Sequence, residues 1–112
     1  MTMTSSPVEL SEQARGLLKA LASDTRQQIL TLFAGGAELT VNEVAERMSL
    51  AQSATSTHLA TLRDGGVLTS RRDWKTVYYR ADAGRIGRAL ADLQLSLWAC
   101  CPAEGCAPPG RD

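Results

Sequence analysis

The sequence lacks the features that mark several large classes of protein. No run of apolar residues approaches the roughly 20 needed to span a bilayer, so we expect no membrane helix. The first residues, Met1 to Ser6, show no basic stretch followed by an apolar one. We therefore expect no signal peptide and a cytoplasmic location. With no internal repeat or low-complexity segment, the 112 residues suit one domain with a modest core.

Signatures of enzymes are also missing. The chain has a single histidine, and no cysteine stands at catalytic spacing to it. We find no glycine-rich phosphate-binding loop and no carboxylate pair suited to acid–base catalysis. An enzyme is therefore the least favoured class of function.

The net charge is zero, which argues weakly against a nucleic-acid partner. The distribution of charge indicates the opposite, because residues 47–88 hold eight basic and three acidic side chains. A phosphate backbone responds to such a local field, although an uneven solvated surface would look the same. The basic residues are Arg47, Arg63, Arg71, Arg72, Lys75, Arg80, Arg85 and Arg88, and the acidic ones are Asp64, Asp73 and Asp82.

Capping residues predict two helices in the first third of the chain. Ser6-Pro7-Val8-Glu9 has the pattern of a capping box with proline at the first helical position. Together with apolar residues at helical spacing, it predicts a helix over residues 7–22. Asp24 is suited to cap a second helix, which the pair Gly35-Gly36 would end.

Two short helices and a hairpin are predicted next. Capping boxes at residues 40–43 and 49–52 each begin a short helix, and the two form a helix-turn-helix. Residues 67–72 and 76–80 are rich in β-branched and aromatic side chains, with Asp73-Trp74-Lys75 between them. A hairpin that directly follows the second helix of a helix-turn-helix is the wing of a winged-helix fold. The predicted fold is mainly α with a β-hairpin wing, a winged helix-turn-helix.

The last predicted helix follows Asp82 and has a coiled-coil-like apolar stripe that includes Cys100. Such a stripe favours packing on a second copy of the chain, although it would also suit a helix that covers its own core. We therefore predict a homodimer. The predicted interface residues are Leu17, Leu21, Ile86, Leu90, Leu93 and Leu97.

All three cysteines, Cys100, Cys101 and Cys106, fall within seven residues near the end of the chain. An odd, clustered set is a poor disulfide framework, and in a reducing cytosol it more often binds metal or reacts. Pro102 disfavours helix at Cys101, and Gly105 permits a turn that could return Cys106. We predict a sensing tail over residues 100–112, after a domain over residues 1–99.

Three thiolates without a nearby histidine suit a soft, three-coordinate ion. Arsenite or antimonite fits, because each takes three sulfur ligands, whereas zinc prefers four ligands. Cadmium, lead, mercury and bismuth remain alternatives. The other alternative to a metal site is a tail whose cysteines have no function.

Residues 18–30 and 52–68 resemble the ArsR/SmtB family of metalloregulators, and the likeness extends over roughly residues 15–98. The resemblance implies a dimeric repressor that leaves its operator when metal binds. This chain has Thr40 and Asn42 where many arsenic sensors of the family have thiols, and its last helix lacks the histidines of the zinc sensors. The tail cysteines resemble a subgroup that places its thiols after the last helix. Trp74 stands where the family often has glycine.

The helix that would read DNA is predicted to begin at about Gln52. Its polar face lies opposite Thr55, Leu59 and Leu62, and polar side chains there can reach base edges. Wing cations would add charge on the flanking backbone or minor groove. Two roles for His58 are equally consistent with the sequence, a contact with a phosphate and packing beside the wing. For Trp74, packing on the hairpin and a contact with DNA both stay open. The predicted DNA-binding residues are Gln52, Ser53, Ser56, Thr57, His58, Arg71, Arg72 and Lys75.

These observations predict a repressor released from double-stranded operator DNA by trivalent arsenic. Two alternatives stay open. One is a repressor of the same fold that is switched by thiol oxidation. The other is a thiol-containing metal-binding or adaptor module without operator binding, which the neutral charge and the lack of Lys or Arg on the reading face would favour.

Overall fold

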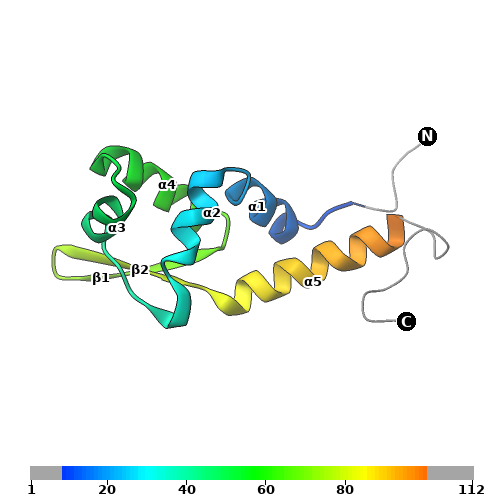
Figure 1. Ribbon diagram of the computed structural model, residues 1–112. Helices are drawn as coiled ribbons and strands as arrows, with labels where there is room; N and C mark the ends of the chain where they lie inside the picture. Colours follow the sequence, from blue (N-terminus) through cyan, green and yellow to red (C-terminus); the bar gives the residue numbers. More distant parts are fainter. Residues whose placement is uncertain (1–8, 101–112) are drawn as a thin grey trace.

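A computed structural model describes residues 9–100 of the chain. Within them lie five α-helices, a short 3-10 turn and one antiparallel hairpin, which confirms the predicted winged helix-turn-helix. Figure 1 shows the hairpin with α3 and α4 at one end, while α5 extends to the other end beneath α1. The elements are α1 (Glu12–Ala20), α2 (Asp24–Thr31), η2 (Ala34–Gly36), α3 (Val41–Met48), α4 (Gln52–Asp64), β1 (Leu68–Asp73), β2 (Thr76–Ala81) and α5 (Ala83–Cys100).

The hydrophobic core lies where α2, α4 and the hairpin meet. Its largest fully buried side chains include Phe33, Ile29 and Leu59. The backbone of Leu39 pairs with that of Tyr79 in β2, with N–O distances of 3.0 and 2.8 Å. This bridge fixes the base of the wing to the segment that leads into α3.

The two faces of α4 differ as the sequence predicts. Thr55, Leu59 and Leu62 are fully buried. The Thr55 hydroxyl donates to the carbonyl of Ala51 at 2.9 Å, so this buried polar group has a partner. The opposite face of the helix is exposed.

The predicted start of the first helix at Pro7 is wrong. Residues 9–11 are not helical, and α1 begins after Ser11, whose hydroxyl accepts from the amide of Ala14 at 3.1 Å. The same hydroxyl donates to the carboxylate of Asp92 on α5 at 2.9 Å. Asp92 lies 81 residues after Ser11, and its hydrogen bond helps to hold Ser11 as the capping residue. A local sequence pattern could not reveal this contact.

Two further predicted caps are shifted, and one is confirmed. Ser23, not Asp24, caps α2. Ala51 precedes α4 without a side-chain cap, because Ser49 ends α3 in the left-handed conformation (φ 56°). Thr40 and Glu43 form the predicted capping box of α3, with bonds of 2.8 and 3.2 Å.

Helix α1 crosses the end of α4 at two glycines. A Cβ atom added to Gly65 would lie 2.6 Å from the carbonyl oxygen of Gly16 and 2.7 Å from the Cβ of Ala20. No side chain fits in that gap, so glycine lets the two helices approach closely. This crossing connects the helix-turn-helix to the α1–α5 layer.

Asp82 caps α5 as predicted, because its carboxylate accepts from the amide of Arg85 at 3.2 Å. Its contacts with the core come mainly from Ala89 and the half-buried Ile86. Leu17 was predicted at a dimer interface, but it is only 4% exposed and packs within its own protomer. No helix in residues 9–100 is both long and apolar enough to cross a membrane.

Candidate nucleic-acid interface and thiol site

The exposed face of α4 presents all four polar residues predicted to read bases, Gln52, Ser53, Ser56 and Thr57. The Thr57 hydroxyl donates to the carbonyl of Ser53 at 3.2 Å. Its oxygen can therefore still accept from a ligand, whereas the Gln52 amide can both donate and accept. The face suits base edges that combine donors and acceptors, as adenine does in the major groove.

His58 is half-buried and faces α2, not the wing. Its Nδ1 lies 3.5 Å from Nη1 of Arg26. Arginine can only donate, so Nδ1 is the acceptor in this contact. Packing beside the wing, one of two predicted roles, is therefore wrong, and a phosphate contact through Nε2 stays a prediction.

Arg26 is a positioning residue that the sequence did not reveal. Its Nε donates to the carbonyl of Ala20 at 2.7 Å and its Nη2 to that of Lys19 at 3.3 Å. The guanidinium thus satisfies the last carbonyls of α1 while touching His58 on α4. Nothing in the local pattern around residue 26 distinguishes it from a solvated arginine.

Arg71 differs from the other predicted wing cations, because it is paired within the protomer. Its Nε and Nη2 donate to the two carboxylate oxygens of Glu38, each at 2.9 Å. Its guanidinium carbon also lies 4.7 Å from the centre of the Tyr78 ring. Hydrogen bonding to Arg71 lowers the pKa of Glu38, and the same bond raises the pKa of Arg71. Arg71 is therefore paired with Glu38 in the protomer, and its predicted contact with DNA stays a prediction.

Arg72 and Lys75 are exposed, and within the described residues neither forms an ion pair. Arg72 pairs with Val77 across the hairpin, so it projects from the face opposite Arg71. Both cations stay available for the predicted contacts with a phosphate backbone.

A shallow apolar groove runs along the outer face of α5. Leu90 is 52% exposed and Leu97 49% exposed, which leaves two of the predicted interface residues uncovered in the protomer. Leu21 and Ile86 are half-buried against the protomer's own core. The groove is lined by Gly87, Leu90, Ala91, Leu93, Gln94, Leu97 and Trp98.

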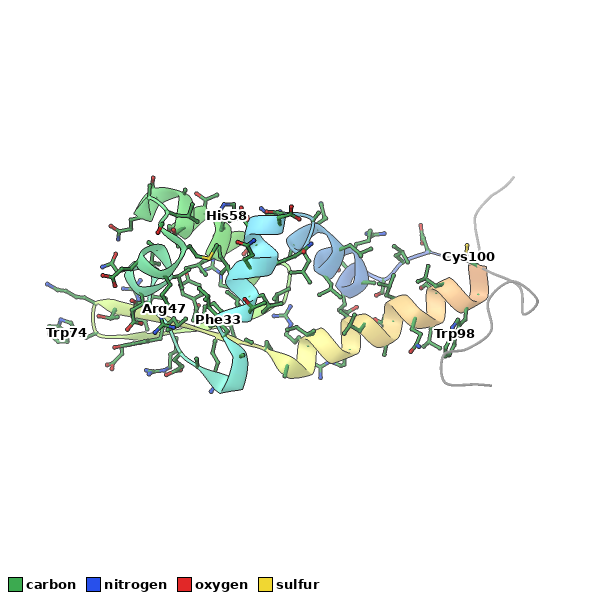
Figure 2. All side chains as sticks on the ribbon, viewed as in Figure 1. Phe33, Arg47, His58, Trp74, Trp98 and Cys100 are labelled. Atoms are coloured by element: carbon green, nitrogen blue, oxygen red, sulfur yellow. The ribbon has the colours of Figure 1, made fainter. Side chains whose placement is uncertain are left out.

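Cys100 is a free, exposed thiol in the last turn of α5 (Figure 2). It still belongs to the helix, at the position where the predicted tail begins, and the predicted boundary between domain and tail stays a prediction. Cys101 and Cys106 fall outside the described residues. Among residues 9–100 no three His, Cys, Asp or Glu side chains gather as a metal site would require, and the three-thiol site therefore stays a prediction.

Known proteins resemble this chain over most of its length. A helix-turn-helix domain model matches residues 21–71. The transcriptional activator HlyU of Vibrio cholerae is 39% identical over 79% of this chain and 80% of its own length. An arsenic resistance transcriptional regulator of Pseudomonas putida is 44% identical over 57% of this chain and half of its own length.

A solved structure gives the same result. The homodimeric winged helix-turn-helix DNA-binding domain from Mycobacterium bovis, described as a possible ArsR-family regulator, is 31% identical with a TM-score of 0.64. The likeness covers 87% of this chain and 90% of that domain. The chain therefore belongs to the ArsR-type family of winged helix-turn-helix transcriptional regulators.

Proposed function

We propose that this regulator is a homodimeric repressor that leaves its operator when trivalent arsenic or antimony binds the thiolates of Cys100, Cys101 and Cys106. The observation that supports DNA binding most strongly is the exposed polar face of α4 beside the unpaired wing cations. Relatives that are transcriptional regulators support a role in DNA binding and not in catalysis.

In this proposal α4 enters the major groove and the wing contacts the flanking backbone. Gln52 and the adjacent hydroxyls would select bases, while Arg72 and Lys75 would supply salt-dependent affinity. Two copies would read half-sites about 34 Å apart, one turn of the double helix.

The second copy would pack on the groove of α5. Leu90 and Leu97 expose apolar surface there that a partner could cover. The related domain from Mycobacterium bovis is homodimeric, which supports the same assembly for this chain.

Two observations support arsenic as the inducer. The cysteine cluster supplies three sulfur donors, and the similar regulator from Pseudomonas putida is named for arsenic resistance. The ion would supply a soft centre that holds three thiolates together. Because Cys100 is on the same helix as the groove, ligation there would bear directly on the dimer.

Fluorescence anisotropy tests the proposal. The reduced protein is titrated onto DNA from upstream of its own gene, and arsenite is then added to the complex. We expect tight binding that arsenite weakens by about 5–150-fold, a typical allosteric coupling. Zinc serves as a control ion, because three thiolates leave it one ligand short.

Single Cys→Ser variants at positions 100, 101 and 106 identify the ligands. Each should keep DNA binding and lose the response to arsenite. A response that survives Cys106→Ser would disprove three-thiol sensing. Release by an oxidant but not by arsenite would favour the redox-switched repressor, and no DNA binding at low salt would favour the adaptor module.

A further inference from the structure

Trp74, at the tip of the wing, has no packing role in the protomer. Its side chain is 82% exposed, more than Leu95 (61%) or any other large hydrophobic residue in the described part of the chain. Packing on the hairpin, one of the alternatives from the sequence, is therefore wrong. An indole held in water contributes nothing to burial of apolar surface.

The backbone at Trp74 is also unfavourable for a large side chain. Its φ is 63°, in the left-handed region that bulky residues rarely adopt. Glycine or asparagine would make the same turn with less strain. The fold thus gains nothing from tryptophan at this position, neither from packing nor from turn geometry.

The surroundings of Trp74 suit a nucleic acid. Lys75 follows it directly, and Arg72 stands two residues before it with the acidic Asp73 between them; all three side chains are exposed. Figure 2 shows Trp74 at the end of the molecule opposite Cys100 and Trp98, beyond the helices of the helix-turn-helix. An exposed aromatic ring next to a cation fits a groove with apolar sugar walls and phosphate rims, where apolar side chains can wedge against base steps.

We propose that Trp74 is a DNA contact, with its indole packed in the minor groove next to the half-site read by α4. This inference rests on the proposed function. The indole supplies the part of the affinity that does not depend on salt, while Lys75 supplies a part that does. Trp74 also favours groove shapes and base steps that admit a flat ring, so it contributes to the choice of operator.

The test uses two kinds of variant on the same operator DNA. Trp74→Gly and Trp74→Asn keep the turn and remove the ring, so a loss of folding is not expected, and thermal melting verifies this. We expect about tenfold weaker binding, within the range for loss of one aromatic–nucleic-acid stack. The slope of log K against log salt should not change. Lys75→Gln is the matched control, and it should reduce that slope by about 0.9. Trp74→Phe should restore most of the affinity.

A spectroscopic measurement is independent of affinity. The chain has two tryptophans, Trp74 and Trp98, so the difference in emission between the unsubstituted protein and Trp74→Phe isolates Trp74, and this difference should be quenched when DNA binds. Unchanged emission in the complex, or equal affinity of Trp74→Asn and the unsubstituted protein, would overturn the inference alone. Failure of the unsubstituted protein to bind DNA at low salt would overturn both the inference and the proposed function.

Discussion

The two ends of the molecule are built differently. At the helix-turn-helix end, side chains such as Phe33 and Leu59 are fully buried, and the exposed positions of α4 and the wing are mostly polar or charged. Along α5 only Ala89 is buried, and large apolar side chains such as Leu90 and Leu97 face solvent. The first end has its own core, whereas the second has an apolar face that requires a partner.

Helix α1 contacts both ends of the molecule. Ser11 caps α1 and also bonds Asp92 on α5, while Gly16 meets Gly65 at the end of α4. A shift of α5 against its partner would therefore reach α4 through a tightly packed helix crossing, where small displacements are not easily absorbed.

Charges placed on the α5 groove should have the largest effect. We expect the double variant Leu90→Glu, Leu97→Glu to be monomeric by light scattering and to bind operator at least about 100-fold more weakly, because two half-sites no longer act together. Leu95→Glu is the matched control: Leu95 is exposed on the same helix but does not line the groove. A double variant that stays dimeric would contradict the interface.

Filling the helix crossing should destabilise the whole domain. Gly65→Ala places a methyl group against Gly16 and Ala20, and overpacking of this kind costs about 1–3 kcal/mol of unfolding free energy. Gly84→Ala, on α5 with ordinary contacts only, should be neutral or stabilising by up to about 1 kcal/mol. Urea unfolding of both variants measures the difference, and equal stabilities would show that the crossing tolerates a side chain.

A change on the reading face should alter DNA binding without altering dimerisation. Gln52→Ala should weaken operator binding by about 5–150-fold, because one base contact contributes about 1–3 kcal/mol of discrimination. It should also reduce the sequence specificity at one base pair. Gln28→Ala, an exposed glutamine on α2, is the control. Binding to a panel of single-base operator variants checks both effects. An unchanged base preference would remove Gln52 from the reading surface.

The smallest effect is expected at the Glu38–Arg71 pair. Glu38→Gln should leave Arg71 free to meet a phosphate, which would steepen the salt dependence of binding by about 0.9 per contact. Glu46→Gln, on the exposed face of α3, is the control. Glu43 is avoided because it belongs to the capping box of α3. An unchanged salt slope would show that Arg71 cannot reach the DNA even when it is unpaired.

The same pair gives a pH dependence with a definite sign. The folded-state pKa of Glu38 is lowered by Arg71, so its contribution to stability is present at neutral pH. That contribution is lost as the pH falls through the folded-state pKa, below the ordinary value of 4.5. Thermal melts at stepwise lower pH should show a smaller loss for Glu38→Gln than for the unsubstituted protein.

Features set by local spacing were predictable from the sequence, and features set by distant contacts were not. The buried face of α4 and the hairpin follow from apolar period and β-branched content, and both are confirmed. The start of α1 was missed because Ser11 is also held by Asp92 from the far end of the chain. Arg71 looked like any wing cation, because its partner Glu38 lies 33 residues earlier and reaches it through the Leu39–Tyr79 bridge.

In the proposed function, arsenite binding at the tail thiols and DNA binding at α4 are coupled, and thermodynamic linkage makes this coupling measurable. Arsenite affinity is measured by isothermal titration calorimetry for the reduced protein alone and for its complex with operator DNA. Linkage requires DNA to weaken arsenite binding by the same factor by which arsenite weakens DNA binding, and we expect about 5–150-fold. Equal arsenite affinity in the two titrations would show that arsenite binding does not change the affinity for DNA. The proposed release of the operator by arsenite would then be wrong.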